Sequence, residues 1–213
     1  MTFKTHPKVY RFKKITDWLS RGTYSKNLAK ELEEDFKIRE TILSFFGKKA
    51  MIEKIEIERV GDKINILIHT AKPGLVIGQK GELVEKLKQK IKKEILKEEK
   101  ELRVEIRDVP FPWASAEIVA QWVALQLEKR LPYRKVLKQA LAKASSTKGV
   151  KGVKIQVSGR LDGVEIARSE WVKKGALPRT TIRSDIDFAV KEAKTKVGIV
   201  GVKVWIYKGE RED

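Results

Sequence analysis

The sequence contains no cysteine, and its 213 residues include only two histidines, His6 and His69. Disulfide bonds and thiolate zinc sites are therefore excluded, because both are built from cysteine side chains. Two isolated histidines also exclude a histidine-rich metal site. Since no second histidine or cysteine is placed to work with His69, we expect a packing or surface role for it and not catalysis. We accordingly predict neither a metal site nor a cofactor.

Long apolar runs are missing as well. No stretch approaches the roughly 20 apolar residues that a membrane-spanning helix needs, and the N-terminus carries no signal-peptide pattern. We therefore expect a soluble, cytoplasmic protein without a membrane partner. Disorder is not expected, because hydrophobic residues make up 41% of the chain. That fraction suffices for one large domain or for two domains of about 100 residues each.

Acidic residues are in the minority, since 29 Asp and Glu stand against 47 Lys and Arg, and the formal net charge is +18. Such an excess is typical of proteins that bind nucleic acid. An anionic membrane surface is the competing partner, but the basic residues are spread over both halves of the chain and do not gather beside one apolar helix face. The charge balance therefore favours nucleic acid.

The first half of the chain contains a Gly-x-x-Gly segment at 78–81, followed by a basic amphipathic run. Two glycines separated by two residues let the chain turn sharply without β-carbons, so that a flat or anionic group can approach the main chain. The first amide groups of a following helix are unpaired donors at the positive end of its dipole. This arrangement suits phosphate, and it predicts an RNA-binding loop made of Gly78, Gln79, Lys80, Gly81 and Lys72.

Hydrophobic periodicity predicts the elements around this loop. Ser25 is expected to cap the first helix and Gly47 to end it, and Gly61-Asp62 is expected to join two alternating strands in a hairpin. The apolar residues of both long helices are expected to face a core. The predicted elements are a helix over 25–46, strands over 52–60 and 63–70, a short helix before the loop, a helix over 82–96 and a strand over 102–107.

This order of elements resembles a type-II KH domain, in which helices pack on a three-stranded sheet. The resemblance implies an RNA-binding module whose loop grips about four nucleotides of a single strand. We assign residues 21–109 to this domain. Residues 1–20 precede it as a basic N-terminal arm, which either orders on RNA or is a frayed terminus.

A domain junction is expected at Pro110-Phe111-Pro112, because proline disfavours helix on its N-terminal side. Two helices follow, over 114–130 and 133–144. At about 100° per residue, the apolar residues of the second helix share one arc, and three cations fall on the opposite arc. These cations are Arg134, Lys135 and Lys138.

A solvated face is the ordinary interpretation of such a basic helix surface. However, no acidic residue occurs between Leu131 and Asp162, so the three cations of the second helix have no neutralising neighbour in the sequence. Like charges at helical neighbour spacing repel one another. A partner that carries phosphate would offset this repulsion.

The remaining sequence predicts strands and basic loops. Asp162-Gly163 is expected to turn the chain between two strands of a second hairpin, while 184–196 fits a strand or a helix. The predicted strands are 153–158, 164–172, 200–207 and, with the ambiguity stated, 184–196. Residues 110–213 should thus form a two-helix, four-stranded α/β two-layer domain, which makes the whole chain α+β.

Further basic residues of this domain are candidates for contact with RNA, although arginines that hold the domain to itself are an equal alternative. These residues are Arg160, Arg168, Lys173, Lys174, Arg179 and Arg183.

Longer segments resemble the family of the bacterial-type ribosomal protein number three of the small subunit, and the resemblance covers nearly the whole chain. Besides Glu56 and Arg59, the segments are 68–74 (IHTAKPG), 157–161 (VSGRL), 165–171 (EIARSEW) and 201–210 (GVKVWIYKGE). The resemblance implies a structural constituent of the small-subunit head that binds small-subunit ribosomal RNA and contacts the tenth and fourteenth small-subunit proteins. It also favours strand for 184–196. We expect no homo-oligomer.

The same resemblance implies that Arg134, Lys135 and Lys138 line the channel where messenger RNA enters and assist in positioning and unwinding the message. Gln139 departs from this pattern, because some relatives carry a further basic residue there. The role of the basic helix is thus a prediction from family likeness that agrees with its charge.

An enzymatic role is not expected. Asp185 and Asp187 would share one side of a strand and could hold magnesium, but two carboxylates without a third acid or a nearby base make a poor hydrolytic site. No Gly-x-x-x-x-Gly-Lys-Ser/Thr motif is present, so the chain cannot drive unwinding by its own nucleotide hydrolysis. The alternatives to a ribosomal role are a free-standing KH-type RNA chaperone and a nucleic-acid lyase or nuclease.

Overall fold

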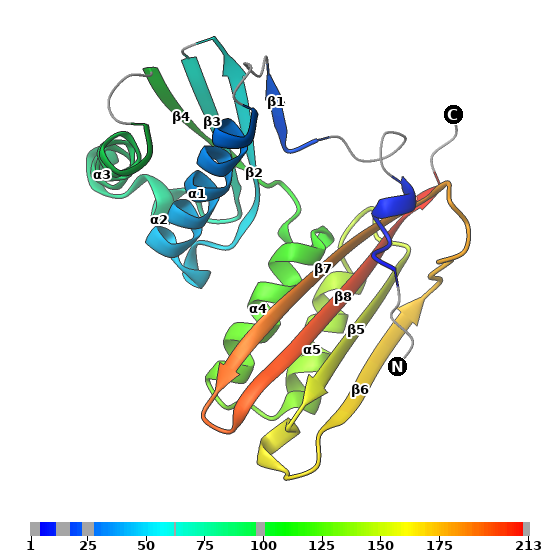
Figure 1. Ribbon diagram of the computed structural model, residues 1–213. Coiled ribbons are helices and arrows are strands. Elements are labelled where there is room, and N and C mark those ends of the chain that lie inside the picture. The colour runs from blue at the N-terminus through cyan, green and yellow to red at the C-terminus, as the bar shows by residue number, and fades with distance from the viewer. Residues whose placement is uncertain (1–4, 12–17, 23–27, 62, 97–100, 211–213) are drawn as a thin grey trace. The chain divides into compact units, whose positions relative to one another are not determined.

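The computed structural model describes residues 5–11, 18–22, 28–61, 63–96 and 101–210 (Figure 1). The chain divides into two units, Trp18–Pro110 and the combination of Met1–Asp17 with Phe111–Asp213. Each unit has a hydrophobic core of its own. Ser25, the predicted helix cap, and Asp62 of the predicted hairpin turn lie outside the described residues.

The unit of residues 18–110 contains a four-stranded sheet in the order β1-β2-β3-β4. The predicted hairpin is confirmed, because β2 and β3 pair antiparallel, and β1 and β4 join the two edges in parallel. The very short β1 was not expected from the sequence and adds a fourth strand to the predicted three. The strands are β1 (Ser20–Gly22), β2 (Ile52–Val60), β3 (Lys63–Thr70) and β4 (Glu101–Asp108).

Three helices pack against this sheet, namely α1 (Leu28–Phe46), α2 (Pro73–Ile77) and α3 (Glu82–Ile91), and a π-helical turn over Lys92–Leu96 extends α3. The predicted core stripe of α3 is confirmed at Leu87 and Ile91, which are fully buried. On α1, Ile38 is buried but Phe36 is exposed, as are Leu28 and Leu32. The expectation that all apolar residues of α1 face the core was therefore wrong. Two successive residues turn an α-helix by about 200°, so Phe36 and Ile38 lie on nearly opposite sides of the helix.

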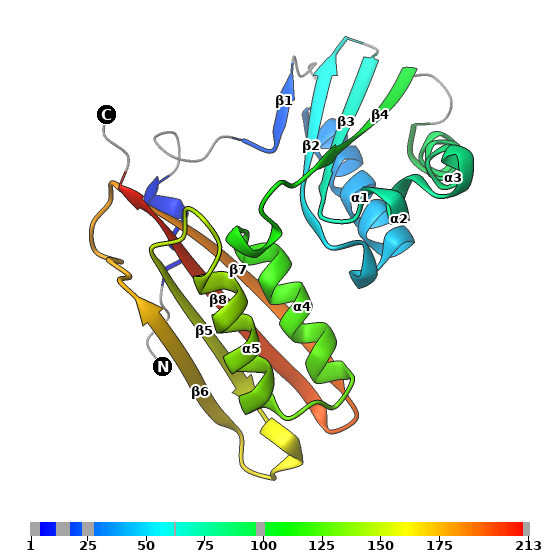
Figure 2. The same ribbon diagram turned by 180° about the vertical axis from the view of Figure 1, so that it is seen from behind.

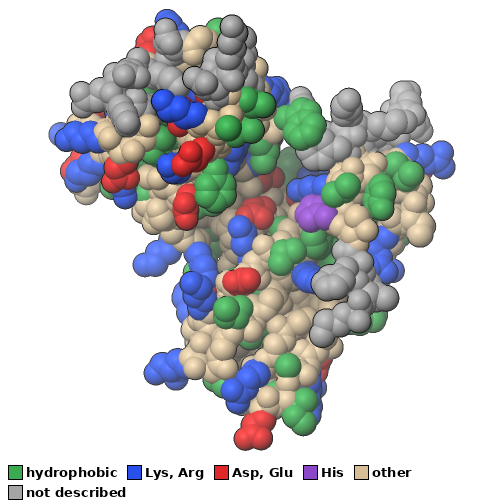
Figure 3. Space-filling view, viewed as in Figure 1, with side chains coloured by type: hydrophobic (Ala, Val, Ile, Leu, Met, Phe, Trp, Pro, Cys, Tyr) green, Lys and Arg blue, Asp and Glu red, His purple; other side chains and the backbone are tan. Residues whose placement is uncertain are grey.

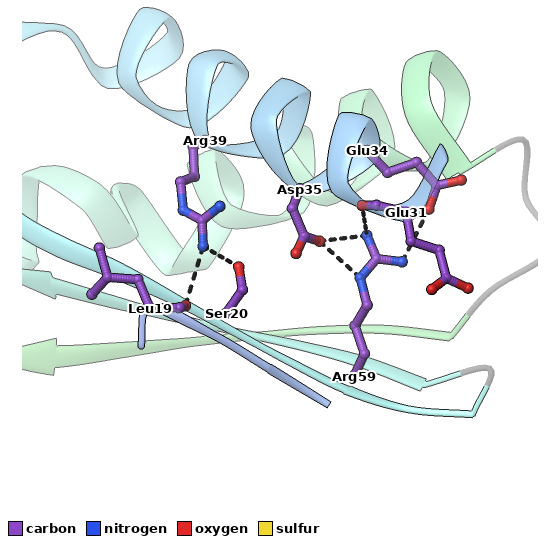
Figure 4. A network of polar contacts seen from close by, with 7 residues as sticks. All are labelled: Leu19, Ser20, Glu31, Glu34, Asp35, Arg39 and Arg59. Carbon is purple, nitrogen blue, oxygen red and sulfur yellow. Dashed lines mark hydrogen bonds and ion pairs between the residues drawn. The ribbon is translucent and has the colours of Figure 1, made fainter. Parts of the chain in front are cut away.

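An ion-pair network fastens α1 to the sheet (Figure 4). The Arg59 guanidinium on β2 donates through Nε to Asp35 Oδ1 at 2.7 Å and through Nη1 to Glu34 Oε2 at 3.0 Å. Arg59 is only 3% exposed and Asp35 only 1%. Burial alone would lower the pKa of Arg59, but the hydrogen bonds and charges of Asp35 and Glu34 raise that pKa above its ordinary value. Arg59 thus stays charged inside the unit.

The other unit is a two-layer structure in which α4 (Ala116–Glu128) and α5 (Tyr133–Ser145) cover one face of an antiparallel sheet (Figure 2). This arrangement confirms the predicted two helices on four strands, and it confirms strand for 184–196. The sheet order is β6-β5-β8-β7. The strands are β5 (Gly152–Gly159), β6 (Arg168–Gly175), β7 (Ser184–Thr195) and β8 (Gly198–Glu210).

The connection between β5 and β6 is longer than predicted, since β6 begins at Arg168 and not at Val164. Leu161–Gly163 forms a 3-10 turn in which Asp162 has a φ of 52°. This turn takes the chain out of the ladder, and Gly159 already pairs with Arg168. The hairpin is confirmed, whereas the predicted strand start was wrong.

Residues 5–11 pack on the two-layer unit. Arg11 is buried, and its guanidinium donates to four backbone carbonyls at 2.7–3.0 Å, those of Pro7, Arg179, Thr181 and Ser184. Lys8 Nζ lies 2.8 Å from Asp187 Oδ1. The His6 ring lies edge-on to Phe188, with 4.7 Å between the ring centroids. The described part of the expected N-terminal arm therefore has a structural role within this unit.

Candidate nucleic-acid interface

The Gly-x-x-Gly loop between α2 and α3 needs glycine at both ends. Gly78 has a φ of 73° and a ψ of −173°, and Gly81 has a φ of 83°. A β-carbon on Gly78 would lie 2.6 Å from Leu83 Cγ, whereas one on Gly81 would meet nothing within 4 Å. The two residues between them, Gln79 and Lys80, are exposed. The predicted loop thus presents its backbone and a cation to solvent.

Three further charged residues, Lys72, Glu82 and Lys86, determine the charge of the surface near this loop. Lys72 is exposed directly before α2, and within the described part of the chain neither Lys72 nor Lys80 forms an ion pair. Glu82, the first residue of α3, forms an ion pair with Lys86. A hydrogen bond from Lys86 holds the pKa of Glu82 below its usual value. Because Lys86 offsets this carboxylate, the cations of the loop keep a net positive surface.

Helix α5 presents the predicted basic face. Its apolar side is buried at Val136, Leu137, Ala140 and Ala144. On the opposite side the cations Arg134, Lys135 and Lys138 are all exposed, as is Gln139. This arrangement agrees with the helical-wheel prediction, which rests on the 3.6-residue period alone.

A carboxylate that the sequence analysis missed accompanies this face. Tyr133 Oη donates to Glu170 Oε1 at 2.7 Å, Arg134 Nε donates to Tyr133 Oη at 3.0 Å, and Arg134 Nη2 lies 3.5 Å from Glu170 Oε1. The hydrogen bond from Tyr133, together with Arg134, holds the pKa of Glu170 below its usual value. Within the described residues Lys135 and Lys138 form no ion pair, so these two cations remain free.

The other predicted RNA-contact residues fall into two groups. Arg160 donates to Val164 O at 3.0 Å and to Val197 O at 3.3 Å, and Arg183 Nε lies 2.9 Å from Glu210 Oε2. These two arginines hold the unit to itself, which was the stated alternative. The remaining four side chains are exposed, at Arg168, Lys173, Lys174 and Arg179.

Aromatic rings alternate with cations on the sheet face that the helices leave open. Lys154 Nζ on β5 lies 4.6 Å from the ring centroid of Trp171 on β6 and 5.4 Å from that of Trp205 on β8. Each contact is within cation–π range. Sequence reasoning missed this cluster, because only the strand register brings its members together.

Lys and Arg side chains lie over both units, with Asp and Glu among them, on the face drawn in Figure 3.

Asp187, one of the two aspartates considered above as magnesium ligands, has structural partners. Asp187 Oδ2 accepts from the Ala116 N–H at 2.8 Å at the start of α4, and Asp187 Oδ1 binds Lys8. Burial alone would raise the pKa of Asp187, but Lys8, Lys208 and the Ala116 N–H hold that pKa below its usual value. Among the described residues, no group of three or more His, Cys, Asp or Glu is arranged so that it could hold a metal ion. No helix in the described ranges is long and apolar enough to cross a membrane.

Comparison with known proteins supports both units. Residues 37–114 match the KH domain family, and residues 123–206 match the family described as ribosomal protein S3, C-terminal domain. The chain is 47% identical over 207 residues to the small ribosomal subunit protein uS3 of Thermodesulfovibrio yellowstonii, covering 97% of this chain and 94% of the relative. It is 46% identical to the protein of the same name from Caldicellulosiruptor saccharolyticus, covering 97% and 92%. For the Lawsonia intracellularis protein, the identity is 44% and the coverage 97% and 95%.

Proposed function

This chain belongs to the family of the small ribosomal subunit protein uS3, and we propose that it places α5 at the channel where messenger RNA enters the small subunit. Members of this family are structural ribosomal proteins and not enzymes, so binding and positioning constitute the function. Membership in this family implies ribosomal RNA and neighbouring ribosomal proteins as partners. It also implies a location in the small ribosomal subunit in the cytoplasm.

The observation that carries the proposal is the basic face of α5. Arg134, Lys135 and Lys138 are exposed together, and Lys135 and Lys138 have no ion-pair partner among the described residues. An RNA strand that lies along this face would gain one phosphate contact from each cation and release the counterions of those phosphates. Holding single-stranded message in this way would favour opened over base-paired RNA, which assists positioning and unwinding without nucleotide hydrolysis.

Translation of structured messages by reconstituted ribosomes tests this proposal. Replacing Arg134, Lys135 and Lys138 by Ala should slow elongation through a stable hairpin and leave an unstructured message unaffected. A matched triple variant at Lys148, Lys151 and Lys203, which are exposed in the same unit, should behave as the unaltered protein. Equal rates on both messages with the α5 variant would contradict the role of α5.

For the Gly-x-x-Gly loop we propose contact with ribosomal RNA of the small-subunit head. Gln79 and Lys80 are exposed on a turn whose backbone is accessible. Replacing both residues by Asp should weaken binding of the full chain to small-subunit ribosomal RNA without unfolding it, because two anions would face the RNA backbone. Unchanged affinity would leave the loop as scaffold only.

The tenth and fourteenth small-subunit proteins are the proposed protein partners, and no homo-oligomer is proposed. The exposed apolar residues Leu28, Leu32 and Phe36 of α1 offer a surface suited to a protein neighbour. Co-sedimentation of the chain with small subunits in high salt, followed by cross-linking from Phe36, tests this assignment. Recovery of the chain free of subunits would instead favour the alternative of a free-standing RNA chaperone.

A further inference from the structure

A pocket of about 490 Å³ lies at one end of the two-layer unit. Three connections enclose it, which are the α4–α5 loop, the 3-10 turn over Leu161–Gly163 and the β7–β8 turn. Pockets of roughly 300–1,000 Å³ are typical of small-molecule sites. None of the residues proposed above to bind messenger RNA lines it.

The floor of this pocket is apolar. Leu127, Leu161 and Val200 line it, and all three are buried members of the core of the unit. Pro132 and Val197 extend the apolar lining. A flat, poorly hydrated group would therefore gain free energy by lying on this floor.

Cations surround the floor. Arg130, Arg160 and Lys196 line the pocket, and its one acidic residue, Asp162, uses Oδ1 to accept from the Tyr133 N–H at 3.4 Å. The hydrogen bonds of Arg160 to the carbonyls of Val164 and Val197 fix its guanidinium between two of the enclosing connections. The pocket thus combines an apolar floor with an excess of positive charge.

The backbone at Arg130 gives an independent sign of function. Arg130 N donates to Leu127 O at 2.9 Å and Leu131 N donates to Gln126 O at 3.2 Å, which is the Schellman pattern at the end of α4. The residue in the left-handed conformation of this motif is usually glycine, but here it is Arg130, with a φ of 61°. Backbone strain of this kind clusters at functional sites, where the surrounding structure holds the residue in place.

We propose that this pocket binds one unstacked nucleotide of an RNA strand, with the base on the apolar floor and the phosphate between Arg130 and Lys196. Tyr133, the first residue of α5, connects the pocket to the basic face of this helix. This residue lines the pocket, and its hydroxyl accepts a hydrogen bond from Arg134. A nucleotide is favoured over an apolar peptide segment, because its phosphate would form charge-assisted hydrogen bonds with the cations that line the pocket. The proposal does not depend on the role of α5 at the messenger RNA channel.

Methyl NMR of the full chain, with Leu and Val methyl groups labelled, tests the pocket. Titration with adenosine monophosphate should shift the methyl signals of Leu127, Leu161 and Val200, and adenosine should shift them more weakly. Inorganic phosphate should leave them unchanged, because phosphate alone does not reach the floor. Unshifted pocket methyls, or equal shifts with phosphate alone, would overturn the proposal.

Two variants separate binding from folding. Arg130→Gly should weaken nucleotide binding about tenfold, which is the effect of losing one hydrogen bond to a charged group. The same variant should raise thermal stability, because glycine suits the left-handed position. Lys129→Ala removes a neighbouring exposed cation that does not line the pocket and should bind normally. Equal weakening by both variants would show that nucleotide binding depends only on the net positive charge of this region, and it would overturn the proposal.

Cross-linking in assembled small subunits identifies which RNA supplies the nucleotide. A photoreactive p-benzoylphenylalanine at position 197 should cross-link to RNA, and sequencing of the product separates ribosomal from messenger RNA. Cross-links to neighbouring proteins alone would overturn the assignment. This outcome is independent of the translation assay for α5, so the two proposals fail separately.

Discussion

Arg134 Nη2 lies 3.5 Å from Glu170 Oε1, and the Tyr133 hydroxyl binds both side chains. The basic face of α5 therefore contains one cation that is fixed by a strand residue and two that are free. Contacts with Tyr133 and Glu170 orient Arg134, whereas Lys135 and Lys138 can follow a partner by rotation of their flexible side chains. The carboxylate also lowers the local positive potential that an approaching RNA strand meets.

Glu170→Gln should strengthen RNA binding by the full chain, because among the described residues it removes the one carboxylate that pairs with a cation of the α5 face. The glutamine can still accept from Tyr133, so the fold should be retained. Affinity for a single-stranded RNA should rise, and the dependence of affinity on salt should steepen. Titrations at several salt concentrations measure both quantities.

Glu165→Gln is the matched control, since Glu165 is an exposed acid in the same unit and forms no ion pair among the described residues. It should change RNA affinity less than Glu170→Gln does. An equal gain from both variants would show that net charge alone governs binding.

The elements of both units were largely predictable, because each depends on local periodicity. The alternation over 52–60 and 63–70 and the arc of Val136, Leu137 and Ala140 were enough to place two strands and the basic face of α5. The short strand β1 was missed, since three residues carry no period. The exposed residues of α1 were assigned to the core because apolar type alone does not say which of two helix faces is covered.

The parts of the candidate site that escaped prediction depend on contacts distant in sequence. Glu170 reaches Tyr133 across 37 positions, and Lys154 and the two rings beside it come from three strands. Such neighbours follow from sheet register, which the sequence does not specify alone. A tyrosine at the start of a basic helix was the available signal, because a buried hydroxyl needs a hydrogen-bond partner.

The two loop glycines should differ in their tolerance of alanine. Gly78→Ala should destabilise the unit of residues 18–110 by about 3 kcal/mol or more, because the backbone conformation of Gly78 is nearly restricted to glycine and the new β-carbon would overlap Leu83. Gly81→Ala should cost only about 1–2 kcal/mol, since its β-carbon meets open space and only the left-handed φ is strained. Hydrogen exchange of the β3 amides measures both, and equal costs would contradict the geometry.

Arg59→Ala should strongly destabilise the same unit. It leaves Asp35 buried without its cation, and breaking a buried ion pair in this way costs about 3–5 kcal/mol. Arg103→Ala is the control, because its partner Glu105 lies in an exposed pair that contributes at most about 1 kcal/mol. Hydrogen exchange in β2 and β3 reports the difference. A mild effect at Arg59 would show that α1 is held by packing alone.

Docking of residues 5–11 should weaken as the pH falls. Burial chiefly lowers the pKa of His6, Lys8 adds to this effect, and Asp187 opposes it. His6 Nδ1 also accepts from the Lys8 N–H at 3.2 Å, which requires that nitrogen to be unprotonated. The unfolded segment thus binds more protons, so docking is complete above the ordinary histidine value of about 6.5 and is lost as the pH falls below it.

Amide exchange of residues 5–11 between pH values of about 7.5 and 5.5, corrected for intrinsic rates, measures this change around the ordinary histidine pKa. His6→Phe is the informative variant, because it keeps an aromatic ring against Phe188 and cannot be protonated. Its protection should stay constant over the same interval. A fall of equal size in the variant would assign the pH dependence to another group.

Arg11 fastens the same segment by geometry that no other side chain reproduces. The three nitrogens of its guanidinium, which lie in one plane, donate hydrogen bonds to four carbonyls. These carbonyls belong to Pro7, Arg179, Thr181 and Ser184. A lysine ammonium has three donors on a single nitrogen, so it cannot span carbonyls that lie on different sides of a guanidinium. The charge would be kept while most of the hydrogen bonds would be lost.

Arg11→Lys should therefore release residues 5–11 and loosen the 179–184 loop together, because both depend on the same planar group. Hydrogen bonds to a charged group contribute about 1.5–3 kcal/mol each, so the loss of more than one should outweigh the remaining contacts of His6 and Lys8. Hydrogen exchange of both segments in the full chain measures the effect. Arg183→Lys, at an exposed pair with Glu210, should leave both segments protected. If Arg11→Lys also left them protected, charge and not planar geometry would hold the N-terminal segment in place.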